Sequence, residues 1–189
     1  MKRTIIKNAN IINDNKIFES DILIEDSFIS KISKSISPSF PNTKIIDVEG
    51  NFVIPGLIDD QVHFREPGLT HKGNIYTESR AAVAGGITSY FEMPNTEPNT
   101  TTIHELNKKF GIAKENSIAN FSFMFGGTNT NLKEILKNNI SEIPAIKLFL
   151  GSSTGNMLVD DLNSIENIFS NVEIPIAVHC EDEKTIKII

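Results

Sequence analysis

The feature that most constrains the fold is a regular alternation of short apolar runs and longer amphipathic stretches after Pro55-Gly56. Five apolar runs, at residues 56–64, 86–94, 120–127, 145–151 and 174–180, are continuous, as buried parallel strands should be. Residues 75–84, 103–115, 131–138 and 161–169 lie between them and have helical character. The strands begin about every 30 residues, which is the size of a βα unit. This rhythm predicts an α/β fold with a parallel sheet.

The first 54 residues follow a different pattern. Their apolar residues come in short β-prone runs that are broken by Asn, Asp, Gly and Pro, which is typical of a small antiparallel β unit. Residues 34–43, rich in Ser and Pro, are expected to form a surface loop. The sequence therefore predicts two domains, a β subdomain over residues 1–54 and an α/β domain over residues 55–189.

Polar residues at the ends of the predicted strands decide between a barrel and an open sheet. Most of them stand at or near the carboxyl end of a predicted strand, as in the active face of a TIM (β/α)8 barrel: Gln61, His63, Arg65, Asn95, Lys147 and His179. A doubly wound nucleotide-binding fold would need a glycine-rich turn after its first strand, and "REPG" is not one. A complete barrel takes roughly 250 residues. We therefore expect a partial barrel of about five βα units, preceded by a small β-sandwich subdomain.

Composition narrows the function classes. The net charge of −6 and the scattered basic residues argue against a nucleic-acid-binding or membrane-binding surface. No stretch is long and apolar enough for a membrane span. The single cysteine, Cys180, excludes an internal disulfide, fits a reducing cytoplasm and is expected to pack in its strand as a small apolar residue. The sequence predicts a cytoplasmic protein and leaves a homodimer open.

Two histidines and a lysine point to a metal. His63 and His179, at matching strand ends, are suited to hold Zn²⁺, although either one alone is as well explained as a core histidine. Lys147 interrupts the apolar run "AIKLFLG", and lysine is rarely buried without a partner. It either reaches the barrel mouth with its ammonium or is chemically altered or bound. Glu181 and Asp182 are candidates to orient His179, or else form an ordinary loop salt bridge.

Arg65 and Asn95 are the candidate substrate-binding residues. A guanidinium can grip a carboxylate with two hydrogen bonds, and an asparagine amide can donate and accept at the same place. The alternative for Arg65 is a structural pair with a nearby acid, namely Glu66, Glu92 or Glu181. The alternative for Asn95 is simple turn formation in "MPNT".

These residues carry a resemblance to a known family. "PGLIDDQVHFREPG", "ESRAAVAGGITSYFEMPNTEP", "IKLFLGSSTGNM" and "VHCED" resemble the amidohydrolase superfamily and, within it, the dihydroorotases. The resemblance implies a metal-dependent barrel enzyme that opens and closes the ring of dihydroorotate to give N-carbamoyl-L-aspartate in pyrimidine biosynthesis. It also implies that the chain is the N-terminal part of such an enzyme, with the catalytic acid expected beyond residue 189.

The resemblance also assigns roles to the polar residues. It implies one or two zinc ions, with His63, Lys147 and His179 as metal ligands and Lys147 in the place of the lysine that many relatives carboxylate. Whether Lys147 is carboxylated is left open. Arg65 and Asn95 would bind the carboxylate of the substrate.

One position departs from the family pattern. Gln61 stands where the family has the first histidine of a His-x-His pair, and a neutral amide oxygen is a weaker zinc ligand than imidazole. Whether Gln61 ligates a metal is left open. Two alternatives therefore stand beside the dihydroorotase reading: a hydantoinase or allantoinase of the same superfamily, and an inactive homologue that serves as a structural partner of another enzyme.

Overall fold

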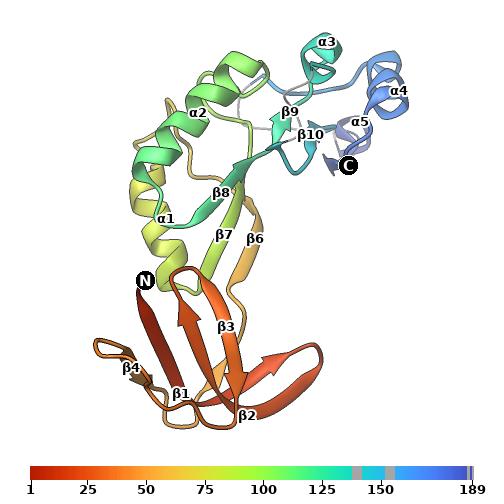
Figure 1. Ribbon diagram of the computed structural model, residues 1–189. Helices are drawn as coiled ribbons and strands as arrows, with labels where there is room; N and C mark the ends of the chain where they lie inside the picture. The colour runs from red at the N-terminus through yellow and green to blue at the C-terminus, as the bar shows by residue number, and fades with distance from the viewer. Residues whose placement is uncertain (138–141, 152–155, 187, 189) are drawn as a thin grey trace. The chain divides into compact units, whose positions relative to one another are not determined.

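The computed structural model describes residues 1–189 except 138–141, 152–155, 187 and 189. The described residues form two compact units, Met1–Pro55 and Gly56–Ile189 (Figure 1).

The first unit is a five-stranded sheet built around one long strand. Its strands are β1 (Arg3–Asn13), β2 (Lys16–Glu25), β3 (Phe28–Ser33), β4 (Lys44–Asp47) and β5 (Phe52–Val53). β1, β2 and β3 are antiparallel neighbours, whereas β4 and β5 run parallel to β1 along its other edge. The expectation of a purely antiparallel unit is therefore wrong. The loop over residues 34–43 lets the chain return to β1 in the same direction as that strand.

A buried carboxylate holds a bulge in β1. The register between β1 and β2 shifts between Ile6 and Ala9, and Asn8 has a φ of 55°. Asp21 accepts the backbone N–H of Asn8 at 3.0 Å and that of Ile36 at 2.8 Å. Burial alone would raise the pKa of Asp21, but these two hydrogen bonds and the charge of Lys7 together lower it. The carboxylate thus ties the bulge to the start of the loop after β3.

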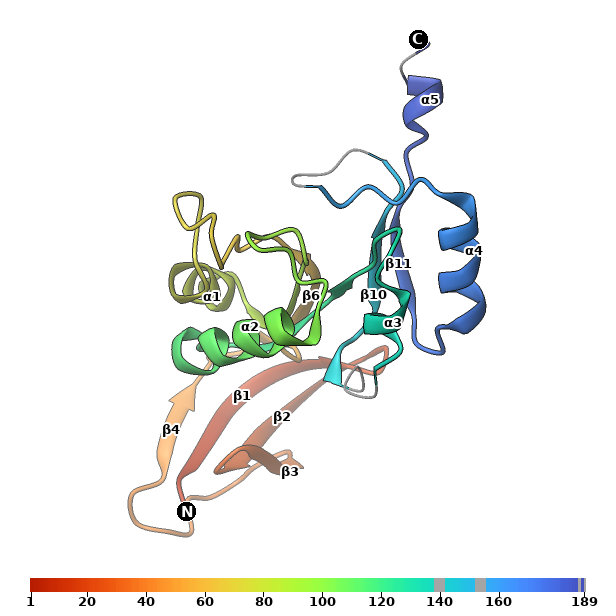
Figure 2. The same ribbon diagram turned by 90° about the horizontal axis from the view of Figure 1, so that it is seen from above.

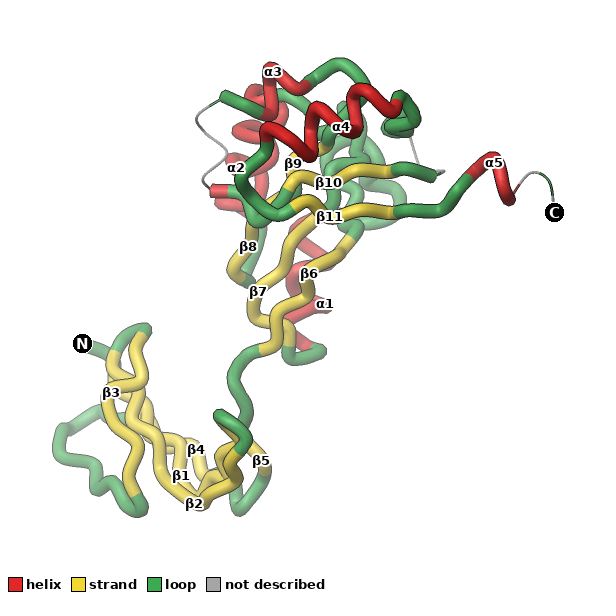
Figure 3. Tube along the Cα trace, turned by 90° about the vertical axis from the view of Figure 1, so that its right-hand side faces the viewer, coloured by secondary structure: helices red, strands yellow, loops and turns green. Residues whose placement is uncertain are grey.

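All the strand pairs described in the second unit are parallel, and paired strands follow one another in the chain. They are β6 (Leu57–Val62), β7 (Ile87–Glu92), β8 (Asn120–Phe123), β9 (Phe125–Gly126), β10 (Ile146–Phe149) and β11 (Ile176–His179). β8 and β9 are two halves of one run, separated at Met124. The first half pairs with β7 and the second half with β10. The single run therefore links two three-stranded ladders (Figure 3).

Four of the described helices lie between the strands, as the sequence predicts, and the short α5 follows the last strand. The helices are α1 (Ile75–Ala84), α2 (Ile103–Asn116), α3 (Leu132–Ile135), α4 (Leu162–Asn171) and α5 (Glu183–Ile186). α1 has its predicted bounds because the Asn74 side chain accepts the Thr77 N–H at its start and Gly85 follows its end. The third predicted helix is shorter than expected, and part of its predicted span, from residue 138, lies outside the described residues. None of the described helices is long and apolar enough to cross a membrane.

The core of the second unit is formed between helices and strands. α1 and α2 pack beside β6–β8, and α3 and α4 beside β9–β11 (Figure 2). Aromatic and aliphatic side chains fill this layer, among them Phe64, Tyr90, Phe123, Phe125, Ile146 and Leu148. All four residues of β10 are buried, but β6 is largely exposed because it pairs only with β7. The expectation that every strand is covered on both faces is therefore wrong for β6.

Candidate functional site

The loop that follows β6 departs from the expected strand alternation at Arg65. The strand ends at Val62, and Arg65 has a φ of 69°, in the left-handed region that non-glycine residues seldom adopt. The strand predicted over residues 56–64 therefore ends earlier than expected, and Arg65 lies in a loop rather than in an extended strand. The main-chain N–H of Arg65 donates to Glu92 Oε1 at 3.0 Å, and its guanidinium donates to the main-chain oxygen of Asn95 at 3.4 Å.

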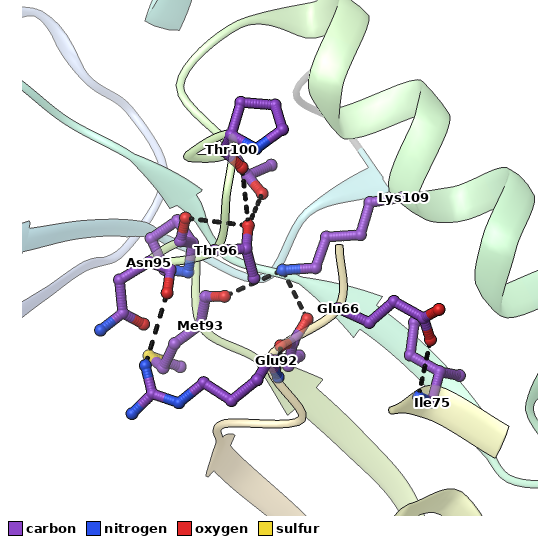
Figure 4. Close-up of polar contacts among 11 residues, drawn as sticks. Glu66, Ile75, Glu92, Met93, Asn95, Thr96, Thr100 and Lys109 are labelled. Carbon is purple, nitrogen blue, oxygen red and sulfur yellow. Dashed lines mark hydrogen bonds and ion pairs between the residues drawn. The ribbon is translucent and has the colours of Figure 1, made fainter. Parts of the chain in front are cut away.

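The loops after β6 and β7 are packed directly on each other. The N–H of Glu97 donates to the carbonyl of Pro67 at 3.1 Å. Gly68 has a φ of +86°, and a Cβ built on it would lie 2.0 Å from the main-chain oxygen of Glu97. Glu66 accepts the N–H of Ile75 at 2.9 Å, which ties the loop to the start of α1 (Figure 4). The "REPG" and "MPNT" segments therefore form one rigid corner of the unit.

Asn95 lies at the centre of this corner. The residue is 4% exposed, and the backbone N–H groups of Thr96 and Thr100 both donate to the Pro94 carbonyl at 2.9 Å. The hydroxyls of Thr96 and Thr100 are 3.4 Å apart (Figure 4). Turn formation, the alternative considered for Asn95, is thus present in the segment, and it buries Asn95 beside the guanidinium of Arg65.

A buried ion pair lies next to this corner. This pair was not predicted from the sequence. Glu92 at the end of β7 pairs with Lys109 of α2, and their side chains are 1% and 0% exposed. Burial raises the pKa of Glu92 and lowers that of Lys109, because each charged form loses hydration, and the pairing opposes both shifts. A signal was available: Lys109 lies three residues after Leu106 and four before Ala113, on the buried face of α2.

Lys147 and Gln61 meet on the neighbouring part of the sheet. Lys147 in β10 is 2% exposed, and its Nζ donates to Gln61 Oε1 at 3.3 Å. Burial lowers the pKa of the Lys147 amine. No carboxylate among the described residues pairs with it, and its ammonium is 5.2 Å from the ring centroid of Phe149.

His179 lies on the adjacent strand of the same ladder. It pairs in register with Phe149, and its Nε2 is 2.7 Å from Glu181 Oε2. Glu181 is thus the acid that contacts it. An open hollow of about 420 Å³ is lined by Gln61, Lys147, His179 and Glu181, together with Val178 and Cys180. Cys180 is exposed, so its expected packing in the strand is wrong.

His63 belongs with the Arg65 and Asn95 corner. Partial burial is the largest cause that lowers the pKa of His63, and the positive charge of Arg65 lowers it further. The side chain nevertheless remains accessible to solvent. A side-chain hydrogen bond with Asn95 opposes these effects, and the charge of Lys147 adds to them. The lowered pKa favours the neutral imidazole, which is the form that can bind a metal.

The structure thus brings the predicted residues together in two neighbouring groups. Gln61, Lys147 and His179 line the hollow, while His63, Arg65 and Asn95 lie at the corner formed by the loops after β6 and β7. Within the described ranges, no three His, Cys, Asp or Glu side chains converge as a metal-binding group. Part of the "GSSTGNM" segment, residues 152–155, lies outside the described residues.

Comparison with known proteins gives matches over nearly the whole chain. Residues 50–127 match the family model described as dihydro-orotase-like. A dihydroorotase from Methanosphaera stadtmanae is 37% identical over 188 residues, covering 98% of this chain and 42% of that protein. One from Fusobacterium nucleatum is 34% identical and covers 97% of this chain and 43% of that protein. The chain therefore spans about two fifths of the length of these relatives.

Solved structures agree with this placement. An L-hydantoinase (dihydropyrimidinase) from Arthrobacter aurescens matches 100% of this chain and 43% of its own, with a TM-score of 0.92 and 31% identity. A D-hydantoinase from Thermus sp. matches 97% of this chain and 41% of its own, with a TM-score of 0.75 and 27% identity. The mixed α/β fold is thus shared with these enzymes, and the sequence is similar to the dihydro-orotase-like family over residues 50–127 and to dihydroorotases over nearly the whole chain.

Proposed function

We propose that the whole protein containing this chain hydrolyses the cyclic amide of dihydroorotate reversibly to N-carbamoyl-L-aspartate. The observation that carries the proposal is the corner at Arg65. Its guanidinium lies 3.4 Å from the Asn95 main-chain oxygen and forms no ion pair with a carboxylate of the described residues. A partly buried guanidinium without an internal acid is suited to bind a carboxylate from outside, and dihydroorotate carries one.

Different residues of the chain would bind different parts of the substrate. Arg65 would grip the substrate carboxylate, and Asn95, fixed in its turn, would direct its amide toward the same group. His63, whose pKa is lowered and is influenced by both Asn95 and Arg65, would lie between the carboxylate clamp and the metal. This arrangement would place the ring amide on the side of Lys147 and the hollow.

Zinc, as one or two ions, is the proposed cofactor, with His63, Lys147 and His179 as its ligands. The fit rests on Lys147, because a 2%-exposed ammonium whose described partner is one amide oxygen is costly. Carboxylation would turn that cation into an anionic oxygen donor, while Glu181 would orient His179. Bound zinc would lower the pKa of a water molecule and polarise the substrate carbonyl.

Gln61 would act mainly as the partner of Lys147. Its Oε1 already accepts from Nζ, and a lysine carbamate keeps one N–H that can donate in the same way. An amide oxygen ligates zinc more weakly than imidazole, so the oxygen is better used to hold Lys147.

The proposal extends to the architecture. Parallel strands in chain order, with polar residues beyond their carboxyl ends, support a partial TIM barrel for the second unit. The first unit would be the flanking β subdomain of that barrel enzyme.

The decisive experiment measures the purified, zinc-loaded whole protein on dihydroorotate and on N-carbamoyl-L-aspartate. The variant Arg65→Lys keeps the positive charge but loses the two-hydrogen-bond grip of the guanidinium on a carboxylate. A hydrogen bond to a charged group is worth about 1.5–3 kcal/mol, so KM for dihydroorotate should rise by about 10- to 100-fold. The matched control is Arg80→Lys on α1, where Nη1 bonds only main-chain oxygens of Tyr76 and Asn116. A zinc-loaded protein that leaves both compounds unchanged contradicts the proposal.

A hydantoinase is the second candidate, because the A. aurescens L-hydantoinase structure matches the chain so well. Hydantoin lacks the free carboxylate that would engage Arg65. Parallel rates on hydantoin, allantoin and dihydroorotate separate the candidates, and faster turnover of hydantoin with no effect of Arg65→Lys would favour the hydantoinase.

A metal-free structural homologue is the third candidate, motivated by Gln61. Elemental analysis of protein purified without added metal tests it. Stoichiometric zinc would contradict the metal-free reading.

A further inference from the structure

The Glu92–Lys109 pair is unusual for its setting. Both side chains are essentially inaccessible, and the ring of Phe123 lies over the ammonium, with its centroid 5.1 Å from Nζ. A buried ion pair gives little net stability over well-packed apolar residues of similar size. The folding of this layer therefore does not by itself explain why a charge is present on each side.

The pair makes further hydrogen bonds that lead to the candidate site. Glu92 Oε2 faces Lys109, while Oε1 accepts the main-chain N–H of Arg65 at 3.0 Å. Lys109 Nζ also donates to the main-chain oxygen of Met93 at 2.9 Å (Figure 4). The two side chains thus join the loop after β6, the end of β7 and the middle of α2.

The backbone groups that they hold flank the two proposed substrate-binding residues. One is Arg65 itself, whose left-handed φ of 69° needs an outside contact to keep it. The other is Met93, two residues before Asn95. The Arg65 guanidinium in turn reaches the Asn95 carbonyl, so the pair fixes both ends of the clamp.

We propose that Glu92 and Lys109 are positioning residues that set the geometry of the Arg65–Asn95 carboxylate clamp. The inference rests on the proposed function, because the clamp is the part that it deepens. Lys109 orients Glu92, and Glu92 holds the Arg65 backbone in the conformation that points the guanidinium toward Asn95. Neither residue touches the substrate.

The test uses double variants, so that no charge is left buried alone. Glu92→Leu/Lys109→Met removes both charges and the acceptor for Arg65. Glu92→Gln/Lys109→Met removes the charges but keeps an amide oxygen for the Arg65 N–H. The control is Lys108→Met on the same helix, whose side chain is 50% exposed. Circular dichroism and thermal melting confirm that each variant is folded.

Kinetics give the first readout in the zinc-loaded whole protein. The clamp binds a group that does not react, so its displacement should raise KM and leave kcat unchanged. Displacement of the guanidinium forfeits its hydrogen bonds to the charged carboxylate, so KM of the Leu/Met variant should rise by about 10- to 100-fold. The Gln/Met variant should recover most of the loss, and Lys108→Met should behave as wild type. An unchanged KM in a folded Leu/Met variant overturns the proposal, and so does an equal loss in Lys108→Met.

Amide hydrogen exchange gives a second readout that needs no activity. The Arg65 N–H should be protected in wild type and in the Gln/Met variant, and should exchange faster in the Leu/Met variant. If wild type fails to act on dihydroorotate, the proposed function falls, while the exchange pattern still supports the positioning role. Equal Arg65 exchange in all variants overturns the positioning role whatever the activity.

Discussion

Gly68 should be one of the least replaceable residues of the second unit. It lies where the "REPG" loop meets Glu97, with a φ of +86°. A Cβ at this position would lie 2.0 Å from the Glu97 carbonyl oxygen and 2.8 Å from its carbonyl carbon. Both are backbone atoms, so no side-chain rotation can relieve the contact. The variant Gly68→Ala must therefore move one loop against the other.

The expected cost has two parts. A left-handed conformation costs an L-residue roughly 1–2 kcal/mol, and forcing an extra carbon into a packed site costs about 1–3 kcal/mol. Together they lower the free energy of unfolding by about 2–5 kcal/mol, a large share of the total for a typical domain. Displacement of the loop should also weaken substrate binding through Arg65.

The assay is urea unfolding of the whole protein, followed by far-ultraviolet circular dichroism, with KM for dihydroorotate measured alongside. Gly111→Ala is the matched control, because it lies within α2 and a Cβ there would meet nothing within 4 Å. That change should stabilise the protein by roughly 0.5–1 kcal/mol. The same substitution should therefore act with opposite sign at the two glycines.

One result would refute the reasoning. If Gly68→Ala unfolds at the wild-type urea concentration while Gly111→Ala is stabilised, the two loops do not approach each other as described. A loss in both variants would instead point to a general intolerance of alanine at glycine positions.

Two further predictions concern other carboxylate and amide groups. Asp21→Asn should lower the free energy of unfolding by about 1–3 kcal/mol at pH 7. The folded pKa of Asp21 lies below its ordinary value of 3.8, so its contribution to stability is fully present above that value and is lost as the pH falls through the folded pKa. Urea unfolding of wild type and Asp21→Asn from pH 7 to pH 3 measures this loss. A difference in stability between the two proteins that stays constant down to pH 3 would contradict the role given to Asp21. Gln61→His restores an imidazole beside Lys147, and the variant should retain more zinc than wild type after dialysis against a chelator, as read by elemental analysis. Equal zinc in the two proteins would mean that position 61 does not contribute to the metal site.

The sequence allowed the elements to be predicted because their signals are local. The helix at Ile75–Ala84 was predicted at its observed bounds, since Asn74 and Gly85 mark its ends within a few residues. The order of the strands and the mixed pairing in the first unit depend on contacts between distant residues. The residues of β4 and β5 have the pattern of strands, but no local feature of the sequence indicates that they run parallel to β1.

The sequence allowed candidate site residues to be named, but it did not predict their backbone conformations or their contacts. Lys147 stood out because lysine is rare in an apolar run, and the structure buries it. Arg65 was named as a candidate as well, yet its left-handed backbone was not expected, because the conformation depends on a hydrogen bond that its main-chain N–H donates to Glu92, 27 residues away. Lys109 was overlooked for a similar reason. A lysine in a helix is ordinarily exposed to solvent, and its burial is explained by its ion pair with Glu92 on β7, which the sequence does not reveal.

The division of one run into β8 and β9 has a consequence for how the second unit forms. Each ladder joins runs that follow one another in the chain: Leu57 pairs with Ile87, Tyr90 with Phe121, Phe125 with Ile146, and Ile146 with Ile176. Such short loop closures carry a small entropic penalty, and they let each ladder form as soon as its second strand has been synthesised. Because Met124 separates the two ladders, the β6–β7–β8 ladder can be complete before β10 exists. The two loops that carry Arg65 and Asn95 can therefore be in place while the strand bearing Lys147 is still being made.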